Sequence, residues 1–180
     1  VSGCSGRADV YGKVFSGATL TVMLATVVDL GGEKRNDIGP LANSINQYLL
    51  DRNFSDRFIT GFMAVYDKTG HKLRYVSCGH EPTMLLRNGE FSELRSKNLP
   101  MGIMETESYE VIEVDIQPGD LMFVYSDGVI EYINYDGLKK RLAELETLPP
   151  KEIAQKLYNE LVSDPAHQRD DFTCTVVKFQ

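Results

Sequence analysis

The middle of the chain carries two signals for β-hairpins, and these constrain the fold more than any other feature. One is the turn sequence Asp67-Lys68-Thr69-Gly70 and the other is Asn88-Gly89. Asn-Gly is the strongest short hairpin signal, because both residues tolerate positive φ. The apolar runs that these turns join are Ile59–Tyr66 with Lys72–Ser77, and Met84–Arg87 with Glu90–Leu94. Antiparallel strands are therefore expected in the centre of the sequence.

Helical and further strand patterns surround the hairpins. Apolar residues recur at helical spacing in two early segments, Ser16–Val28 and from Asp37 to about Asp51, and in two late ones, Leu138–Leu145 and Lys151–Val162. Strand patterns are found in Tyr109–Ile116, Leu121–Tyr125 and Phe172–Phe179. Hairpins between helices predict an α+β layered sandwich rather than a doubly wound parallel sheet.

Composition limits the class of protein. The chain has 180 residues, of which 42% are hydrophobic, so we expect one domain over residues 1–180. A net charge of -7 with scattered basic residues argues against a nucleic-acid partner. No apolar run reaches the roughly 18 to 20 residues of a membrane helix, and no leader pattern opens the chain. We therefore expect no direct membrane contact.

The three cysteines, Cys4, Cys78 and Cys174, are far apart and lack metal-binding spacing. An odd and dispersed set favours neither a disulfide framework nor a zinc site, and fits a reducing cytoplasm. None of them begins the C-x5-R loop of a cysteine phosphatase, because Val10, Met84 and Gln180 stand six residues further on. A cysteine nucleophile is therefore not expected.

Three aspartates stand beside predicted regular elements. Asp9 begins the turn-like sequence Asp9–Lys13, Asp127 follows the apolar strand Leu121–Tyr125, and Asp170 precedes the last strand. Mg²⁺ and Mn²⁺ prefer oxygen ligands, so three such carboxylates are suited to one metal centre. An isolated aspartate before glycine is more often a turn residue that caps local N–H groups, and sequence spacing leaves both interpretations open.

Five short motifs follow one another along nearly the whole chain. They are Asp9-Val10-Tyr11-Gly12-Lys13, Cys78-Gly79-His80-Glu81-Pro82, Leu99-Pro100-Met101-Gly102-Ile103, Tyr125-Ser126-Asp127-Gly128-Val129 and Asp170-Asp171-Phe172-Thr173. In this order they resemble the bacterial type 2C-like (PPM superfamily) serine phosphatases of the stage II sporulation protein E class. The combination is specific, although each motif alone is weak.

The resemblance implies a four-layer α-β-β-α sandwich of two mainly antiparallel sheets flanked by helices, with two Mn²⁺ or Mg²⁺ ions at one edge. It implies that the Asp9 carboxylate bridges both ions, that the Val10 carbonyl binds one, and that Asp127 and Asp170 bind one of them. It also implies hydrolysis of phosphoserine or phosphothreonine by metal-activated water, so no side chain acts as the nucleophile.

Other polar residues of the motifs have less direct roles in this interpretation. His80 is expected to organise its Gly-His-x-Pro turn rather than bind metal. Asp171, next to Asp170, is expected to be structural, because successive strand residues point to opposite faces. Lys13 lies where an incoming phosphate would approach, although a solvated lysine is the more ordinary interpretation. Gly79, Gly102 and Gly128 are expected to supply permissive backbone at turns.

The sequence departs from the family pattern at its start. The family has a further acidic ligand upstream of the first motif, within a Gly-Gly-Asp segment, and nothing before Asp9 matches it. Val14 also replaces a glycine that is common in the first motif. We expect the domain to be truncated at its N-terminus, with one metal site incomplete and an exposed sheet edge that dimerisation would cover.

Three functions are compatible with these patterns. The leading one is a metal-dependent protein serine/threonine phosphatase, the output domain of a bacterial signalling protein, whose resemblance implies a phosphorylated anti-sigma factor antagonist as substrate. The second is a degenerate phosphatase fold that binds a partner without turnover. The third is an unrelated α+β binding domain in which the three acidic turns are scattered.

Overall fold

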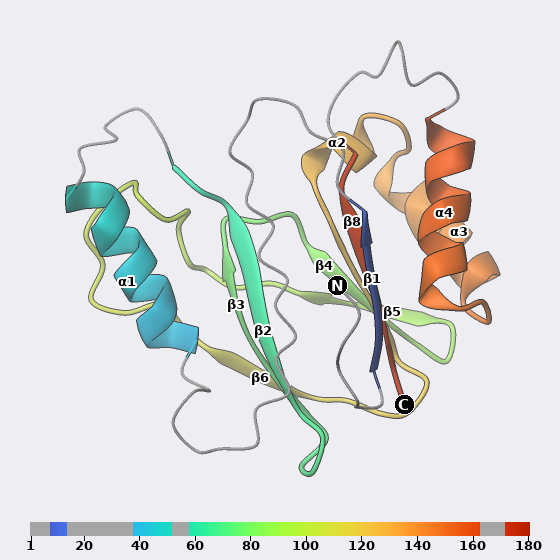
Figure 1. Cartoon of the computed structure of the whole chain (residues 1–180), viewed down its shortest axis with the longest axis horizontal. Coiled ribbons are helices and arrows are strands. Elements are labelled where there is room, and N and C mark those ends of the chain that lie inside the picture. Colours follow the sequence, from blue (N-terminus) through green and yellow to red (C-terminus); the bar gives the residue numbers. More distant parts are fainter. Residues whose placement is uncertain (1–7, 14–37, 52–57, 163–171) are drawn as a thin grey trace. The chain divides into compact units, whose positions relative to one another are not determined.

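The structure, a computed structural model, describes residues 8–13, 38–51, 58–162 and 172–180. The chain divides into two compact units. Within the described residues, the first unit takes in Leu20–His80 and Arg95–Ile116, and the second takes in Arg7–Thr19, Glu81–Leu94 and Gln117–Gln180. Figure 1 shows the elements of both units.

The first unit has a three-stranded antiparallel sheet that is covered by one helix. Its strands are β2 (Gly61–Asp67), β3 (Lys72–Cys78) and β6 (Ile112–Asp115), in the order β2-β3-β6. Helix α1 (Ile38–Asp51) packs on β2 and β3, and buries Ile38 and Ala42 against Met63, Val65 and Val76. The alternation of Met63 and Val65 turns one face of β2 toward the helix.

The second unit has a five-stranded sheet with the order β1-β8-β7-β4-β5, in which all neighbours are antiparallel. The strands are β1 (Ala8–Lys13), β4 (Thr83–Arg87), β5 (Glu90–Leu94), β7 (Leu121–Tyr125) and β8 (Cys174–Phe179). Helices α3 (Tyr135–Leu145) and α4 (Pro150–Leu161) lie on one side of it, and the short α2 (Asp127–Ile130) follows β7 (Figure 1).

The core of the second unit joins alternate strand residues to the two longer helices. Met84, Leu86, Leu121 and Phe123 pack with Leu138, Leu142, Ile153 and Leu157, and all eight side chains are fully buried. The helix residues recur at spacings of three and four, so each helix presents one apolar stripe to the sheet. This core holds β7 in the middle of the sheet, with β4 and β8 as neighbours.

Both predicted hairpins are confirmed. Asn88 and Gly89 have φ values of 51° and 81°, as a two-residue turn with positive φ at both positions requires. The predicted strand Tyr109–Ile116 is shorter in the structure, because its first residues bond elsewhere. The Tyr109 N–H donates to Asn43, and the backbone N–H and C=O of Glu110 both bond the side-chain amide of Asn98.

The predicted turn at Asp9–Lys13 is wrong, because Ala8–Lys13 forms β1 and pairs along the whole of β8. The edge of β8 offers backbone donors and acceptors that this segment satisfies. The predicted helix Ser16–Val28 lies outside the described residues. The α+β class with two antiparallel sheets and helices is confirmed. Among the residues that the structure describes, no helix is long and apolar enough to cross a membrane.

Candidate functional site

Asp127 stands where a fully buried strand reaches solvent. All five residues of β7 are buried, Ser126 is only 4% exposed, and Asp127 is the first exposed residue after them. The central position of β7 fixes this point, because β4 and β8 both pair with it. A rigid strand therefore presents a carboxylate at the end of the sheet, as a functional side chain requires.

The backbone around Asp127 forms a single helical turn rather than the glycine turn that the sequence predicts. Ser126 is the N-cap residue of α2, and its carbonyl accepts from the Val129 N–H at 3.0 Å. The Gly128 N–H donates to Asp127 Oδ1 at 3.0 Å. No described residue donates to Oδ2, and Asp127 is exposed, so this oxygen is available to a ligand.

Ser126 also attaches this turn to the start of β8. Its N–H donates to the Thr173 carbonyl at 2.9 Å, and the Thr173 N–H donates to Ser126 Oγ at 3.2 Å. These bonds are buried and continue the β7–β8 pairing beyond Tyr125 and Cys174. Sequence reasoning missed this contact, although a hydroxyl residue in each of the two motifs was a signal that could have suggested it.

Asp170 and Asp171 lie outside the described residues. Asp170 precedes Thr173 by three positions in a segment that leads directly into β8. The structure thus shows that Thr173, immediately before β8, lies beside Ser126. The metal-binding role of Asp170 stays a prediction.

The pairing of β1 does not bring Asp9 beside Asp127. Asp9 pairs with Lys178, which on its other side pairs with Leu121 at the start of β7, whereas Asp127 follows the opposite end of that strand. Leu121 and Tyr125 are four residues apart, or about 13 Å along the strand. Two aspartates at this separation cannot bind one ion in this register, and the same holds for the Val10 carbonyl.

The remaining predicted residues are placed as follows. Gly79 and Gly102 have positive φ values of 59° and 91°, which confirms their role in turns, whereas Gly128 lies inside α2. His80 follows Gly79 and is half-buried. The backbone of Lys13 pairs with Cys174 of β8, which pairs on its other side with Tyr125 of β7. Among the described residues, no three His, Cys, Asp or Glu side chains form a group that could hold a metal ion.

The described cysteines are unsuited to nucleophilic chemistry. Cys78 and Cys174 are free and fully buried. Burial raises the pKa of the Cys78 thiol to about 12, so the reactive thiolate is scarce at neutral pH. This agrees with the expectation that no cysteine acts as the nucleophile.

Comparison with known proteins identifies the family. The sequence profile described as stage II sporulation protein E (SpoIIE) matches residues 6–180. The phosphoserine phosphatase RsbU of Bacillus subtilis (strain 168) is 27% identical over 180 residues, which cover 95% of this chain and 54% of that protein. The chain therefore spans about half the length of this relative.

Solved structures agree with that assignment. The PP2C phosphatase domain of SpoIIE from Bacillus subtilis, solved with a fragment of its regulatory domain, has 26% sequence identity and a TM-score of 0.67, covering 77% of this chain and 43% of that one. A structure of that phosphatase domain from Mn-presoaked crystals has 20% identity and a TM-score of 0.60, covering 99% and 87%. The chain belongs to the SpoIIE family and has the fold of the PP2C-type serine/threonine phosphatases.

Proposed function

We propose that this chain is a metal-dependent protein phosphatase domain that hydrolyses phosphoserine or phosphothreonine on a regulatory protein. The observation that carries the proposal is the exposed Asp127 carboxylate at the end of buried β7, in a chain related to a phosphoserine phosphatase. As the output domain of a cytoplasmic bacterial signalling protein, it would act on a phosphorylated anti-sigma factor antagonist. Its family membership supports that substrate class.

The residues of the second unit fit a divalent metal in part. Asp127 Oδ2 is available to a ligand, and hard oxygen donors suit Mn²⁺ and Mg²⁺. Asp170 stands three residues before Thr173, which bonds Ser126, so the Asp170 Cα lies at most about 11 Å from the Thr173 Cα. We propose that both carboxylates bind the same ion, and that two ions occupy the complete site.

Asp9 and Val10 belong to this proposal under one condition. They reach the Asp127 end only if β1 pairs four residues further along β8, which would place Asp9 opposite Cys174 instead of Lys178. A shift by an even number of residues preserves the alternation of a strand relative to the two faces of its sheet. Among the described residues β1 pairs with β8 alone, so such a shift changes only the hydrogen bonds between these two strands.

The bound ions would supply an activated water and neutralise the charge of the phosphoryl oxygens. The chain's own contribution is to position the ligands. β7 fixes Asp127, the Gly128 N–H orients its carboxylate through Oδ1, and the Ser126–Thr173 bonds hold the start of β8 against it. The buried residues around this turn leave little freedom for Asp127 to move away.

A second function is favoured by one observation. In the described β1 register, Asp9 lies far from Asp127, and a site with too few carboxylates would bind metal weakly. A non-catalytic phosphatase fold that binds a partner is consistent with that arrangement.

Phosphate release from a phosphoserine peptide with excess Mn²⁺ distinguishes these functions, with Mn²⁺ binding measured in parallel by calorimetry. We expect Asp127→Asn to lower turnover by at least about 100-fold. Asp136→Asn is the matched control, because Asp136 is also exposed in the first turn of a helix. Equal turnover in wild type and Asp127→Asn would contradict the metal site. Absence of both turnover and Mn²⁺ binding in the wild type would support the binding module.

A further inference from the structure

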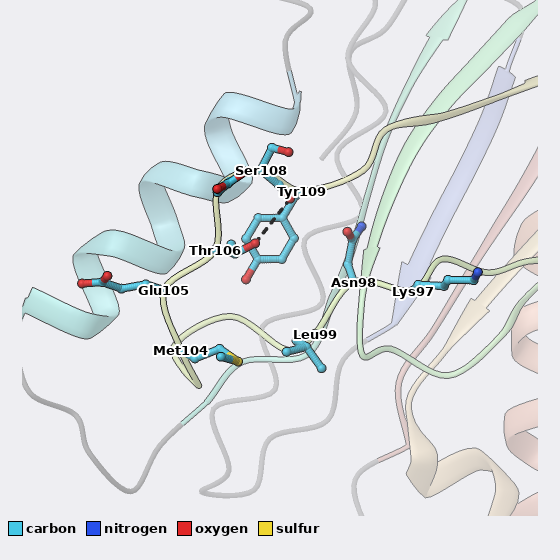
Figure 2. Close-up of a pocket in the computed structure, with 9 residues that line it drawn as sticks. Lys97, Asn98, Leu99, Met104, Glu105, Thr106, Ser108 and Tyr109 are labelled. Atoms are coloured by element: carbon cyan, nitrogen blue, oxygen red, sulfur yellow. Dashed lines mark hydrogen bonds between the residues drawn. The ribbon is translucent and has the colours of Figure 1, made fainter.

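The first unit contains a cavity of about 550 Å³, lined by residues 97–99 and 104–109 (Figure 2). Its size falls within the range of small-ligand pockets, roughly 300 to 1,000 Å³. None of the described lining residues belongs to the proposed metal site, and these described residues all lie in one irregular segment between β5 and β6.

Side-chain amides hold the walls of this cavity in place. Asn46, only 3% exposed, accepts from the Gly102 N–H at 2.7 Å and donates to the Met104 carbonyl at 3.1 Å. Asn98 forms two bonds with the backbone of Glu110, at 2.8 and 3.0 Å. These side-chain bonds to the backbone take the place of hydrogen bonds between strands. They hold the irregular segment in position, so the cavity is formed before any ligand binds.

The floor of the cavity carries the hydroxyl group of Tyr109, which is accessible from the cavity. Tyr109 is 5% exposed, and no described residue bonds its hydroxyl group. Figure 2 shows its ring between the two walls, with the hydroxyl directed into the cavity. A ligand that enters the cavity displaces water from this hydroxyl and has to replace its hydrogen bond, so the hydroxyl favours ligands with a matching polar group. Burial raises the pKa of Tyr109 to about 12, and the group remains a hydroxyl at neutral pH.

The mouth of the cavity is apolar and exposed. Leu99 is 50% exposed, Met104 is 54% exposed, and the neighbouring Ile103 is 49% exposed. Three large apolar side chains exposed within six residues are unusual for a surface that faces only water, and such patches commonly bind another protein. The occupant is therefore expected to bring apolar surface to this rim.

The charge around the cavity is negative. Glu105, Glu107 and Glu110 are exposed, and none of them forms an ion pair with a described residue. Lys97 is the one cation among the lining residues that the structure describes. A cationic group with hydrogen-bond donors is thus complementary to the rim carboxylates and to the hydroxyl oxygen on the floor.

We propose that this cavity binds an arginine side chain carried by a protein partner. The methylenes of arginine would pack on Leu99 and Met104, and its guanidinium would donate to the Tyr109 hydroxyl oxygen and to the Glu105 and Glu107 carboxylates. Arginine suits the site better than lysine, because its planar fork of five donors reaches several acceptors at once. Glu105 points away from Tyr109 in Figure 2, and an exposed side chain changes rotamer within nanoseconds.

This binding is independent of the proposed phosphatase activity, so it can be measured without metal or phosphoprotein. The probe is Nα-acetyl-arginine methylamide, titrated into the ¹⁵N-labelled full chain and followed by amide chemical shifts. We expect saturable shifts confined to residues 97–110, with millimolar affinity. The neutral isostere Nα-acetyl-citrulline methylamide should bind at least about fivefold more weakly, because it lacks the charge.

Variants locate the contacts. Tyr109→Phe removes the hydroxyl and keeps the ring, and should weaken the arginine probe about threefold. Glu105→Gln with Glu107→Gln should weaken it by a similar factor. Glu90→Gln with Glu113→Gln makes the same charge change outside the cavity and should leave the affinity unchanged.

Two results would overturn the proposal. One is an arginine titration that shifts no amide between residues 97 and 110. The other is equal affinity for the arginine and citrulline probes in the wild type. If Tyr109→Phe fails to fold, the glutamate pair still decides, because both side chains are exposed and their replacement is not expected to unfold the chain.

Discussion

Arg87 and Asp120 form a two-pronged ion pair in the second unit, with Nε 2.8 Å from Oδ1 and Nη2 2.6 Å from Oδ2. The Asp120 side chain is 1% exposed, and Oδ2 also accepts from the Gln117 N–H at 2.8 Å. The backbone carbonyl of Asp120 accepts from Phe179 at 2.9 Å. One buried residue therefore joins β4, the turn before β7 and the end of β8.

Asp120→Asn should lower the free energy of unfolding by about 2 to 4 kcal/mol, because it removes the buried carboxylate charge that faces Arg87 and weakens a buried network. Urea denaturation measures this change. The control is Asp115→Asn, which removes the exposed pair with Lys72 and should lower the stability far less than Asp120→Asn. Equal effects of the two substitutions would show that burial of Asp120 contributes little.

Gly79→Ala should destabilise the chain much more than Gly89→Ala. Both glycines have positive φ, at 59° and 81°, so each substitution carries a backbone cost of about 1 to 2 kcal/mol. A Cβ at Gly79 would stand 2.4 Å from Pro100 Cγ, whereas a Cβ at Gly89 would meet nothing within 4 Å. Thermal unfolding of both variants separates the clash from the backbone cost, and similar melting temperatures would contradict the close approach of Pro100.

Much of the fold was predictable because local chemistry determines it. The Asn88-Gly89 turn, the apolar run of β7 and the helical periodicity of α1, α3 and α4 all follow from nearest-neighbour geometry. The predicted strand Tyr109–Ile116 failed at its start for a long-range reason. Asn43 and Asn98 take the backbone groups of Tyr109 and Glu110, and neither asparagine is near them in sequence.

The candidate site was also predictable only where local sequence determines it. The position of Asp127 at the end of a buried strand was predictable from the apolar run of β7. The first acidic residue after that run is an aspartate within a recognisable motif. The Ser126–Thr173 contact and the position of Asp9 depend on pairing between strands that are far apart in sequence. The register depends on both strands of a pair. Apolar and polar residues alternate too weakly in the β1 sequence for that sequence alone to specify how β1 pairs with β8.

Stability should decrease at alkaline pH through two buried groups of the first unit. Burial raises the pKa of Cys78 from 9.0 to about 12, and raises the pKa of Tyr109 from 10.0 to about 12 together with the charge on Cys78. A pKa raised by folding gives stability that is complete below the unfolded value. We therefore expect little change up to about pH 9. Above it, stability should fall by roughly 1 kcal/mol per pH unit through Cys78, and above about pH 10 by a similar amount again through Tyr109.

Urea denaturation between pH 7 and 11 measures this dependence. Cys78→Ala will lower stability at every pH by removing packed atoms, but it should reduce the slope above pH 9, which is the informative quantity. Tyr109→Phe should reduce the slope above pH 10. A wild-type profile that stays flat to pH 11 would show that these groups ionise as readily in the folded chain as in the unfolded one.

The register of β1 gives the sharpest test of the metal proposal. In the described register Gly12 pairs with Thr175, and after the proposed shift of four residues Ala8 would pair with it instead. A Thr175→Cys variant combined with Gly12→Cys should therefore form a disulfide in metal-free protein, because paired Cα atoms lie within bonding range of about 4.4 to 6.8 Å.

With Mn²⁺ present before oxidation, the Ala8→Cys and Thr175→Cys pair should form instead, since the ions attract the Asp9 carboxylate toward the Asp127 end. Adding Asp9→Asn should abolish this effect of Mn²⁺ and weaken Mn²⁺ binding by at least about tenfold. If Mn²⁺ leaves the cross-linking pattern unchanged and Asp9→Asn binds it as tightly as the wild type, Asp9 and Val10 are not ligands. The metal would then be held from the Asp127 turn and the segment before β8 alone.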